Sequence, residues 1–213
     1  MKKRQKWLGW CALIGMYLAL SSQVGAQPVD VSTTDIKISQ KGLNFSQNNS
    51  LLNVWIDQAE QYEMGARKEA VQRIRAAYEN QAVSLDLSGL KITSLPPELE
   101  ALSELKNLNL SNTLIDSFPS FLSGLKNLEW LNLADTPITI IPEGLGNMSN
   151  LQVLNLSKTN IKTLPNSIGN LINLKKLNIS KTQILETELP ETIICLNLEE
   201  MIWPDGERTV PNL

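Results

Sequence analysis

Apolar residues recur along most of the chain with a fixed period. Five leucines are each separated by 23 residues, at Leu85, Leu108, Leu131, Leu154 and Leu177, and a second apolar column lies two residues after the first. The L-x-L step alternates as a β-strand does, so both apolar side chains of a step face the same side. Later apolar positions in each unit are three apart and predict a helical or 3₁₀ return segment. The pattern predicts five strand-and-return units over residues 82–198.

One unit of this kind cannot bury its own leucines, whereas stacked units can. We therefore predict an α/β solenoid, a right-handed superhelix or horseshoe, with a parallel concave sheet whose strands lie about 4.8 Å apart. A proline recurs at the same spacing and would begin each return segment, where its missing N–H does little harm. A column of threonines is expected to form a buried ladder whose hydroxyls satisfy backbone groups of the turns. Its members are Thr113, Thr136, Thr159 and Thr182.

Both ends of the repeat array depart from this pattern. Helical spacing after Ser50, a plausible N-cap, and again over residues 67–78 predicts an N-terminal cap over residues 50–80 that covers the edge of the sheet. The fifth unit carries two extra residues near Glu186 to Glu188, where a binding insertion is an alternative to a simple irregularity. Met201-Ile202-Trp203 predicts a last strand, so residues 199–213 are expected to form a C-terminal cap strand and tail.

The first residues have the composition of a targeting segment. A basic start, an apolar run from Trp7 to Leu20 and the small residues before Ala26 predict a secretory signal peptide over residues 1–26. The alternative is a membrane anchor, but the run is shorter than the roughly 20 apolar residues that a span needs. Residues 27–49 are polar and are expected to form a flexible leader. We therefore expect an exported protein, periplasmic or secreted.

Composition sharpens this picture. The net charge is −3, but removal of residues 1–26 takes four of the 19 basic residues and none of the 22 acidic ones, which leaves about −7. An acidic chain gives no reason to expect nucleic acid as a partner. Without histidine, mechanisms that need an imidazole base are excluded, and neither a phosphate loop nor a metal cluster is evident. Cys195 lies in an apolar frame and is expected to be a buried, inert thiol. We expect no enzyme activity and no cofactor.

The candidate binding residues flank the buried leucines on the concave face. Trp130 and Val153 would be neighbours at the centre of this face, where an exposed tryptophan is typical of a binding hot spot. A column of asparagines could bind a partner or simply form a side-chain ladder. Lysines gather toward the C-terminal half and acidic residues toward the N-terminal half, which suits an acidic protein surface or an anionic glycan as partner. The alternative is a solvated edge that deters aggregation of the sheet. The predicted partner-binding residues are Asn107, Asn109, Glu129, Trp130, Asn132, Val153, Asn155, Lys158, Lys175, Lys176, Asn178 and Lys181.

The 23-residue unit is identified as a leucine-rich repeat, similar to the Thr-Ile-Leu-Pro form of plant resistance proteins and many bacterial repeat proteins. The segment that contains Trp55, Arg67, the run from Ala70 to Ile74 and the first repeat up to Pro96 resembles the helical cap and first repeat of bacterial effectors of the IpaH and YopM kind. Those effectors that are ubiquitin ligases carry a Cys-x-Asp motif in a further domain. Cys195-Leu196-Asn197 lacks the aspartate, so the resemblance implies no ligase activity here.

These observations favour an exported, non-enzymatic module, a monomer that binds another protein of a host or of the cell envelope through its concave face. A secreted effector or virulence-associated protein is the role that the resemblance implies. The alternative is a carbohydrate-binding or cell-wall-binding module that uses the same Trp, Asn and Lys residues. After cleavage of the signal, no stable membrane span is expected.

Overall fold

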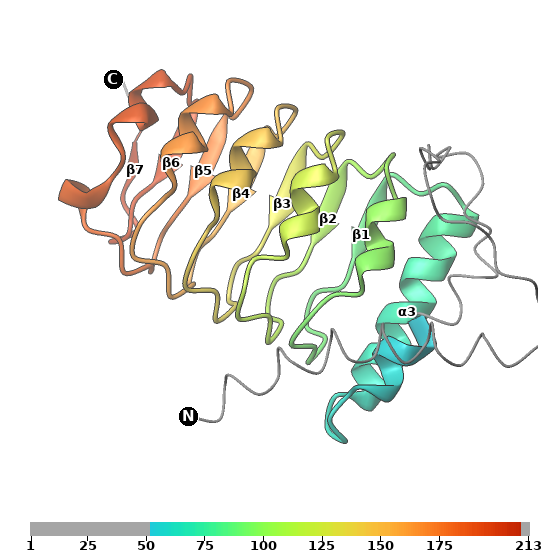
Figure 1. The fold of residues 1–213 in the computed structure, drawn as a ribbon. Coiled ribbons are helices and arrows are strands. Elements are labelled where there is room, and N and C mark those ends of the chain that lie inside the picture. The colour runs from blue at the N-terminus through green and yellow to red at the C-terminus, as the bar shows by residue number, and fades with distance from the viewer. Residues whose placement is uncertain (1–51, 210–213) are drawn as a thin grey trace, which may run out of the picture. The chain divides into compact units, whose positions relative to one another are not determined.

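A computed structural model of the chain describes residues 52–209. The predicted signal peptide, the predicted leader and the proposed N-cap Ser50 lie outside the described residues, as do residues 210–213. Six short parallel strands follow one another in sequence order within one sheet (Figure 1). They are β1 (Ser84–Asp86), β2 (Asn107–Asn109), β3 (Trp130–Asn132), β4 (Val153–Asn155), β5 (Lys176–Asn178) and β6 (Glu200–Ile202).

The register of the sheet follows the 23-residue period. Leu85 pairs with Leu108, and the same pairing continues through the leucine column to Leu177, which pairs with Met201. All of these side chains are buried in one continuous core that runs through the stack. The predicted α/β solenoid with a parallel sheet is thus the observed fold.

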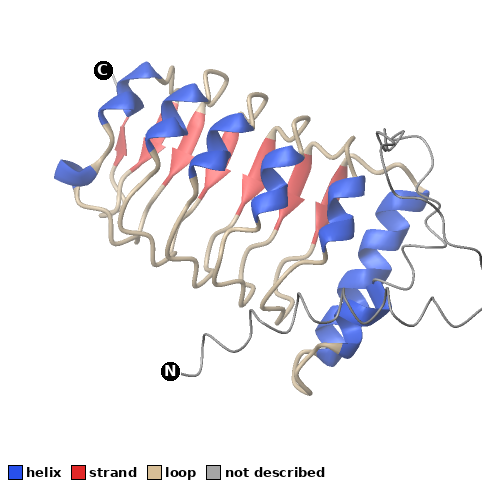
Figure 2. Ribbon diagram, viewed as in Figure 1, coloured by secondary structure: helices blue, strands red, loops and turns tan. Residues whose placement is uncertain are grey.

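The return segments are 3₁₀ helices, which form a second layer along one side of the sheet (Figure 2). Each of the five-residue helices begins directly after a proline in an extended conformation, so the predicted role of the prolines is confirmed. These helices are η2 (Pro97–Ala101), η3 (Ser120–Gly124), η4 (Glu143–Asn147), η5 (Asn166–Asn170) and η7 (Glu191–Cys195).

Successive 3₁₀ helices pack closely where a glycine of one helix faces the next helix. A Cβ atom at Gly146 would be 2.6 Å from the backbone oxygen of Ser167, and one at Gly169 would be 2.7 Å from that of Thr192. In the turns after the strands, each predicted threonine donates its hydroxyl to the carbonyl three residues earlier, at 2.7 to 2.9 Å. Thr113, Thr136 and Thr159 are buried and Thr182 is half-buried, so the predicted ladder is present.

Two helical segments cover the first strand. Residues 52–57 form a short helix that buries Leu52 and Trp55, and α3 (Met64–Glu79) buries Ala70, Val71, Ile74 and Ala77 and contacts β1. The second predicted helix is present and begins three residues earlier than expected. The first ends at residue 57, so Ala59, which we expected on its apolar face, lies in the following bend. None of the helices in the described part of the chain has the length and apolar composition to cross a membrane.

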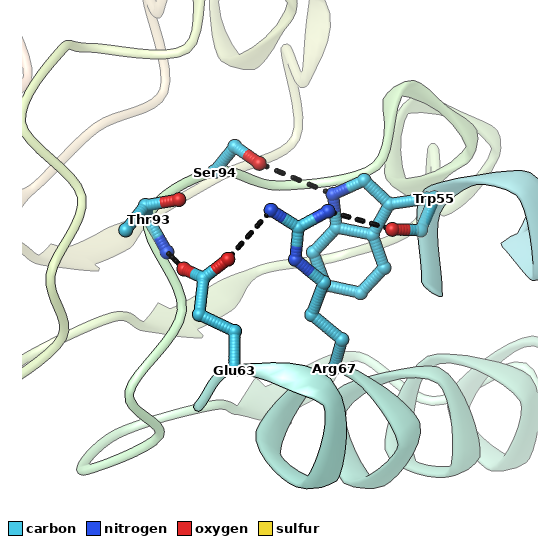
Figure 3. A network of polar contacts seen from close by, with 5 residues as sticks. All are labelled: Trp55, Glu63, Arg67, Thr93 and Ser94. Carbon is cyan, nitrogen blue, oxygen red and sulfur yellow. Dashed lines mark hydrogen bonds and ion pairs between the residues drawn. The ribbon is translucent and has the colours of Figure 1, made fainter. Parts of the chain in front are cut away.

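A buried network of polar contacts links these helices to the first repeat (Figure 3). Arg67 pairs with Glu63 at 2.7 Å and donates to the carbonyl of Trp55 at 2.6 Å, while its guanidinium lies 4.8 Å from the centre of the indole ring. Glu63 accepts the backbone N–H of Thr93 at 2.6 Å, and the indole N–H of Trp55 donates to Ser94 at 3.2 Å. Glu63 and Arg67 are only 1% and 6% exposed, so the network is an integral part of the cap.

The C-terminal end closes differently. Residues 200–202 form β6, one residue earlier than the predicted strand, and Met201 is buried as expected of a cap. A further strand, β7 (Arg208–Thr209), pairs with β6 in the antiparallel direction and was not predicted. The two extra residues of the fifth unit lie by η6 (Glu186–Glu188), whose side chains are all exposed.

Candidate interaction surface

The residues that flank the buried leucines form regular columns on the face of the sheet that points away from the 3₁₀ layer, because side chains alternate along a strand. We call this surface the open sheet face. In the column before the leucines, Asn107 pairs with Trp130, Trp130 with Val153, and Val153 with Lys176. In the column after them, Asn109, Asn132, Asn155 and Asn178 pair in the same way. The register therefore brings the predicted members of each column together.

Trp130 and Val153 are neighbours on adjacent central strands, as predicted. Both are half-buried, so Trp130 is less exposed than expected. Strands lie about 4.8 Å away on either side, so an indole on a central strand stands between the side chains of its neighbours. The pair thus forms a half-covered apolar spot rather than a protruding side chain.

The side-chain oxygens of the asparagine column already accept hydrogen bonds from the protein's own backbone. In each of Asn109, Asn132, Asn155 and Asn178, Oδ1 accepts the backbone N–H two residues later, at 3.0 to 3.2 Å. Such Asx turns guide the chain out of the strand. The side-chain oxygens therefore form local turns, which neither of the two predicted readings anticipated, and the amide N–H groups are what the column can offer to a partner.

Asp86 begins this column and makes the same turn, since it accepts the N–H of Ser88 at 2.9 Å. That hydrogen bond is the main cause of the lowered pKa of Asp86, to which the Ser88 hydroxyl, the charge of Arg73 and the amide of Asn109 also contribute. The carboxylate is consequently ionised well below neutral pH and marks the N-terminal end of the face as acidic.

Three of the four lysines predicted to form a basic cluster lie beside acidic residues of an adjacent repeat. Lys158 lies 4.0 Å from Asp135, whereas Lys175 and Lys176 each lie 3.4 Å from Glu199 and Glu200 respectively. The expectation of a separate basic half is therefore corrected, because the preceding repeat supplies Asp135 to Lys158 and the following repeat supplies Glu199 and Glu200 to Lys175 and Lys176. All these groups are partly exposed, so each pair contributes only about 0 to 1 kcal/mol.

Glu129 makes the equivalent contact toward the N-terminal side of the sheet. Its carboxylate accepts from Lys106 at 2.9 Å, which raises the pKa of Lys106. Lys106 was not among the predicted binding residues. It is related to Glu129 by one repeat length, a signal that could have revealed the pairing.

One further column was missed by the sequence analysis. It follows the asparagine column by three residues and has positive φ throughout, from 57° to 74°, at Gly89, Asn112, Asp135, Lys158 and Lys181. The backbone N–H of each residue donates to a carbonyl of the following repeat, at 2.7 to 2.9 Å. Lysine is unusual in this left-handed conformation, which costs roughly 1 to 2 kcal/mol for a residue with a Cβ atom. The glycine and the asparagine at this position in the first two repeats were the sequence signal that could have revealed the column.

Cys195 is exposed, which contradicts the expected buried thiol. It lies at the end of η7, between the buried residues Ile193, within the helix, and Leu196, directly after it. The three-residue period of a 3₁₀ helix turns the intervening side chains outward. Ile194, 66% exposed, points outward for the same reason.

Comparisons with known proteins agree with this geometry. Residues 81–138 match the model of the leucine-rich repeat family, and residues 126–167 match the model for two copies of leucine-rich repeats. These segments are leucine-rich repeats, and the described chain is a leucine-rich-repeat solenoid. No curated protein matches the sequence.

Similar solved structures come from bacteria. The leucine-rich-repeat domain of a Shigella effector is 24% identical over 73% of this chain and 64% of its own, with a TM-score of 0.55. Internalin C2 of Listeria monocytogenes is 26% identical over 59% of this chain and 54% of its own, with a TM-score of 0.51. A leucine-rich-repeat protein of Leptospira interrogans is 37% identical over 46% of this chain and 25% of its own, with a TM-score of 0.45. The chain thus spans less than two thirds of each.

Proposed function

We propose that this chain is a non-enzymatic module that binds another protein through its open sheet face. The observation that carries the proposal is the apolar pair of Trp130 and Val153 at the centre of an otherwise polar face. Aromatic residues at the centre of a patch, surrounded by polar groups that exclude water, are typical of binding hot spots. Repeat solenoids present extended concave surfaces of this kind to their partners.

The test is affinity capture with the full chain, comparing Trp130→Ala with the matched control Tyr62→Ala. Tyr62 is also aromatic, but it is 66% exposed and lies in the cap, away from the sheet. We expect Trp130→Ala to weaken retention of the partner at least about ten-fold, in the range of a hot spot, and Tyr62→Ala to leave it unchanged. Thermal unfolding of both variants shows whether the half-buried indole also supports the fold. Equal retention by the two variants would exclude the open sheet face.

Export is part of the proposal and rests on the composition of residues 1–26. We expect Gln27 to be the first residue of the exported protein, periplasmic or secreted, which N-terminal sequencing of the purified protein checks directly. An intact Met1 on the exported chain would instead indicate a membrane anchor. The resemblance of the sequence from Trp55 to Pro96 to bacterial effectors supports a role outside the producing cytoplasm. Size-exclusion chromatography tests the expected monomer.

A carbohydrate ligand is the second candidate, because the amide N–H groups of the asparagine column lie beside Trp130. Aromatic rings and amide donors together suit a glycan surface. A glycan array separates the two candidates: binding that Trp130→Ala abolishes would favour the carbohydrate, and its absence, together with capture of a protein, would favour the first.

A further inference from the structure

The charged residues of the open sheet face are arranged in bands that run parallel to the strands. Two acidic side chains flank β3, with Glu129 directly before it and Asp135 three residues after it. Three lysines belong to β5 in the same manner: Lys175 before the strand, Lys176 in it and Lys181 after it. We call these the acidic band and the basic band.

The apolar spot lies next to the acidic band and reaches toward the basic band. Trp130 is the first residue of β3, and Val153 is its partner on β4, the strand between the two bands. Val153 in turn pairs with Lys176. A molecule that crosses the strands at this level therefore meets acidic, apolar and basic groups in that order.

The distance between the bands discriminates between kinds of polypeptide. Two strand spacings separate β3 from β5, which is about 10 Å. In an α-helix, residues i and i+7 lie on one face about 10.5 Å apart, with i+3 and i+4 between them. In an extended chain, three residues span about 10 Å, but residues i and i+3 then point to opposite sides. A helix therefore places residues i and i+7 at the required distance and on the same side, whereas an extended chain does not place residues i and i+3 on the same side.

We propose that the occupant of the open sheet face is an amphipathic α-helix of a partner protein that lies across β3, β4 and β5. It presents a basic residue to Glu129, apolar residues one turn later to Trp130 and Val153, and an acidic residue two turns later to Lys175 and Lys176. This proposal rests on the proposed function, for which it names the partner's recognition element. Charge complementarity and the spacing of the bands carry it.

The ion pairs already present on the face are compatible with such a helix. Lys106 holds Glu129 from the side of β2, and Glu199 and Glu200 hold Lys175 and Lys176 from the side of β6. Glu129, Lys175 and Lys176 are therefore held from the outer sides of the bands, whereas Asp135 pairs with Lys158, which follows β4 between them. Exposed pairs of this kind are weak, so a partner's charges can join or replace them at little cost in free energy.

The test uses three synthetic helical peptides of one length, with leucine at i+3 and i+4 and with Arg/Glu, Arg/Arg or Glu/Glu at i and i+7. Either direction of the helix satisfies the pattern, so the comparison concerns the charge pair and not its order. Binding to the full chain is measured by fluorescence anisotropy at low salt. We expect the Arg/Glu peptide to bind about ten-fold more tightly than the other two, and Trp130→Ala to abolish this binding.

The most discriminating variant reverses the charge of two lysines in the basic band. With Lys175→Glu/Lys176→Glu, the preference should change to the Arg/Arg peptide, whereas the off-face control Lys162→Glu should retain the preference for Arg/Glu. Equal binding of the three peptides, binding of none, or an unchanged preference in the double variant would overturn the helix proposal. If Trp130→Ala still releases the captured partner in those cases, the proposed function stands and only the helix is wrong.

Discussion

The two ends of the solenoid each close the hydrophobic core, but they do so with different interactions. At the N-terminal end, two helical segments are fixed by a buried ion pair between Glu63 and Arg67 that also satisfies the backbone of the first repeat. At the C-terminal end, the core is closed by Met201 and a two-residue antiparallel strand. The first closure depends on hydrogen bonds and an ion pair between buried polar groups, and the second on apolar contact. The ends should therefore differ in how they respond to single substitutions.

The largest effect is expected from Arg67→Met, which leaves Glu63 buried without its partner. Loss of one member of a buried pair typically costs about 3 to 5 kcal/mol. The free energy of unfolding, measured by urea denaturation, should fall by this amount. The double variant Glu63→Gln/Arg67→Met should recover much of the loss, since glutamine keeps an acceptor for the N–H of Thr93. A loss below about 1 kcal/mol for the single variant would show that the network does not hold the cap.

At the opposite end, Met201→Ala should cost about 2 to 4 kcal/mol, because it leaves a cavity at a side chain that is 1% exposed. In a repeat array, each unit contacts only its neighbours, so the damage should stay local. Hydrogen exchange should show faster opening of β5 and β6 with little change in β1. Uniformly faster exchange along the chain would contradict local closure.

A smaller effect with a distinct pH dependence is expected in the first repeat, beside the cap. Burial raises the pKa of Glu98, whose Oε2 atom has no hydrogen-bond partner in the described part of the chain. A raised pKa in the folded state means that ionisation destabilises the fold as the pH rises above the ordinary carboxyl range. Glu98→Gln should therefore stabilise the protein by about 1 kcal/mol at neutral pH and have little effect once wild-type Glu98 is protonated.

Glu143 is the matched comparison for this measurement. Hydrogen bonds from Ser167, with a smaller contribution from the N–H of Asn166, lower its pKa, so its ionised form stabilises the fold. That stabilisation is present above the ordinary carboxyl pKa and is lost as the pH falls through the lowered value. Glu143→Gln should thus destabilise slightly at neutral pH, opposite in sign to Glu98→Gln. The same sign for both in thermal melts would contradict the assignment.

The smallest effects concern the left-handed column, which also differs between the ends. Gly89 in the first repeat has a φ of 74°, and the space that a Cβ atom would occupy there is open, so Gly89→Ala should cost about 1 kcal/mol through backbone strain alone. Lys181 in the last repeat has a φ of 57°, and Lys181→Asn should stabilise by about 0.5 kcal/mol. Chemical denaturation of the two variants tests the contrast, and shifts of equal sign would refute it.

Much of the fold follows from periodicity, because one short unit must bury the same positions in every copy. The leucine, threonine and proline columns were accordingly predicted. The ends were predicted less well: β7 depends on a hairpin that occurs once, and Arg67 is buried only because Glu63 reaches it from a preceding bend. Non-repeated features of this kind have no period to reveal them.

The positions of the residues on the candidate surface were predicted from the sequence, but their interactions were not. The columns that contain Trp130 and Asn132 lie in the expected register, whereas the pairing of Lys175 with Glu199 and the Asx turns of the asparagines were not foreseen. Two of these signals were present in the sequence: opposite charges one repeat apart, and an asparagine two residues before a polar turn. Cys195 shows the opposite error, since an apolar neighbourhood in sequence does not bury every member of a 3₁₀ helix.

The in-register pairing of identical units has a consequence for how the chain can change in length. From β1 to β5, the strand residues of each repeat pair with those of the next in one constant offset, and the threonine and Asx turns are repeated with them. A whole 23-residue unit could therefore be duplicated or deleted with the same contacts on both sides of the junction. The two ends would be unaltered, while the separation of the acidic and basic bands would change in steps of one strand spacing.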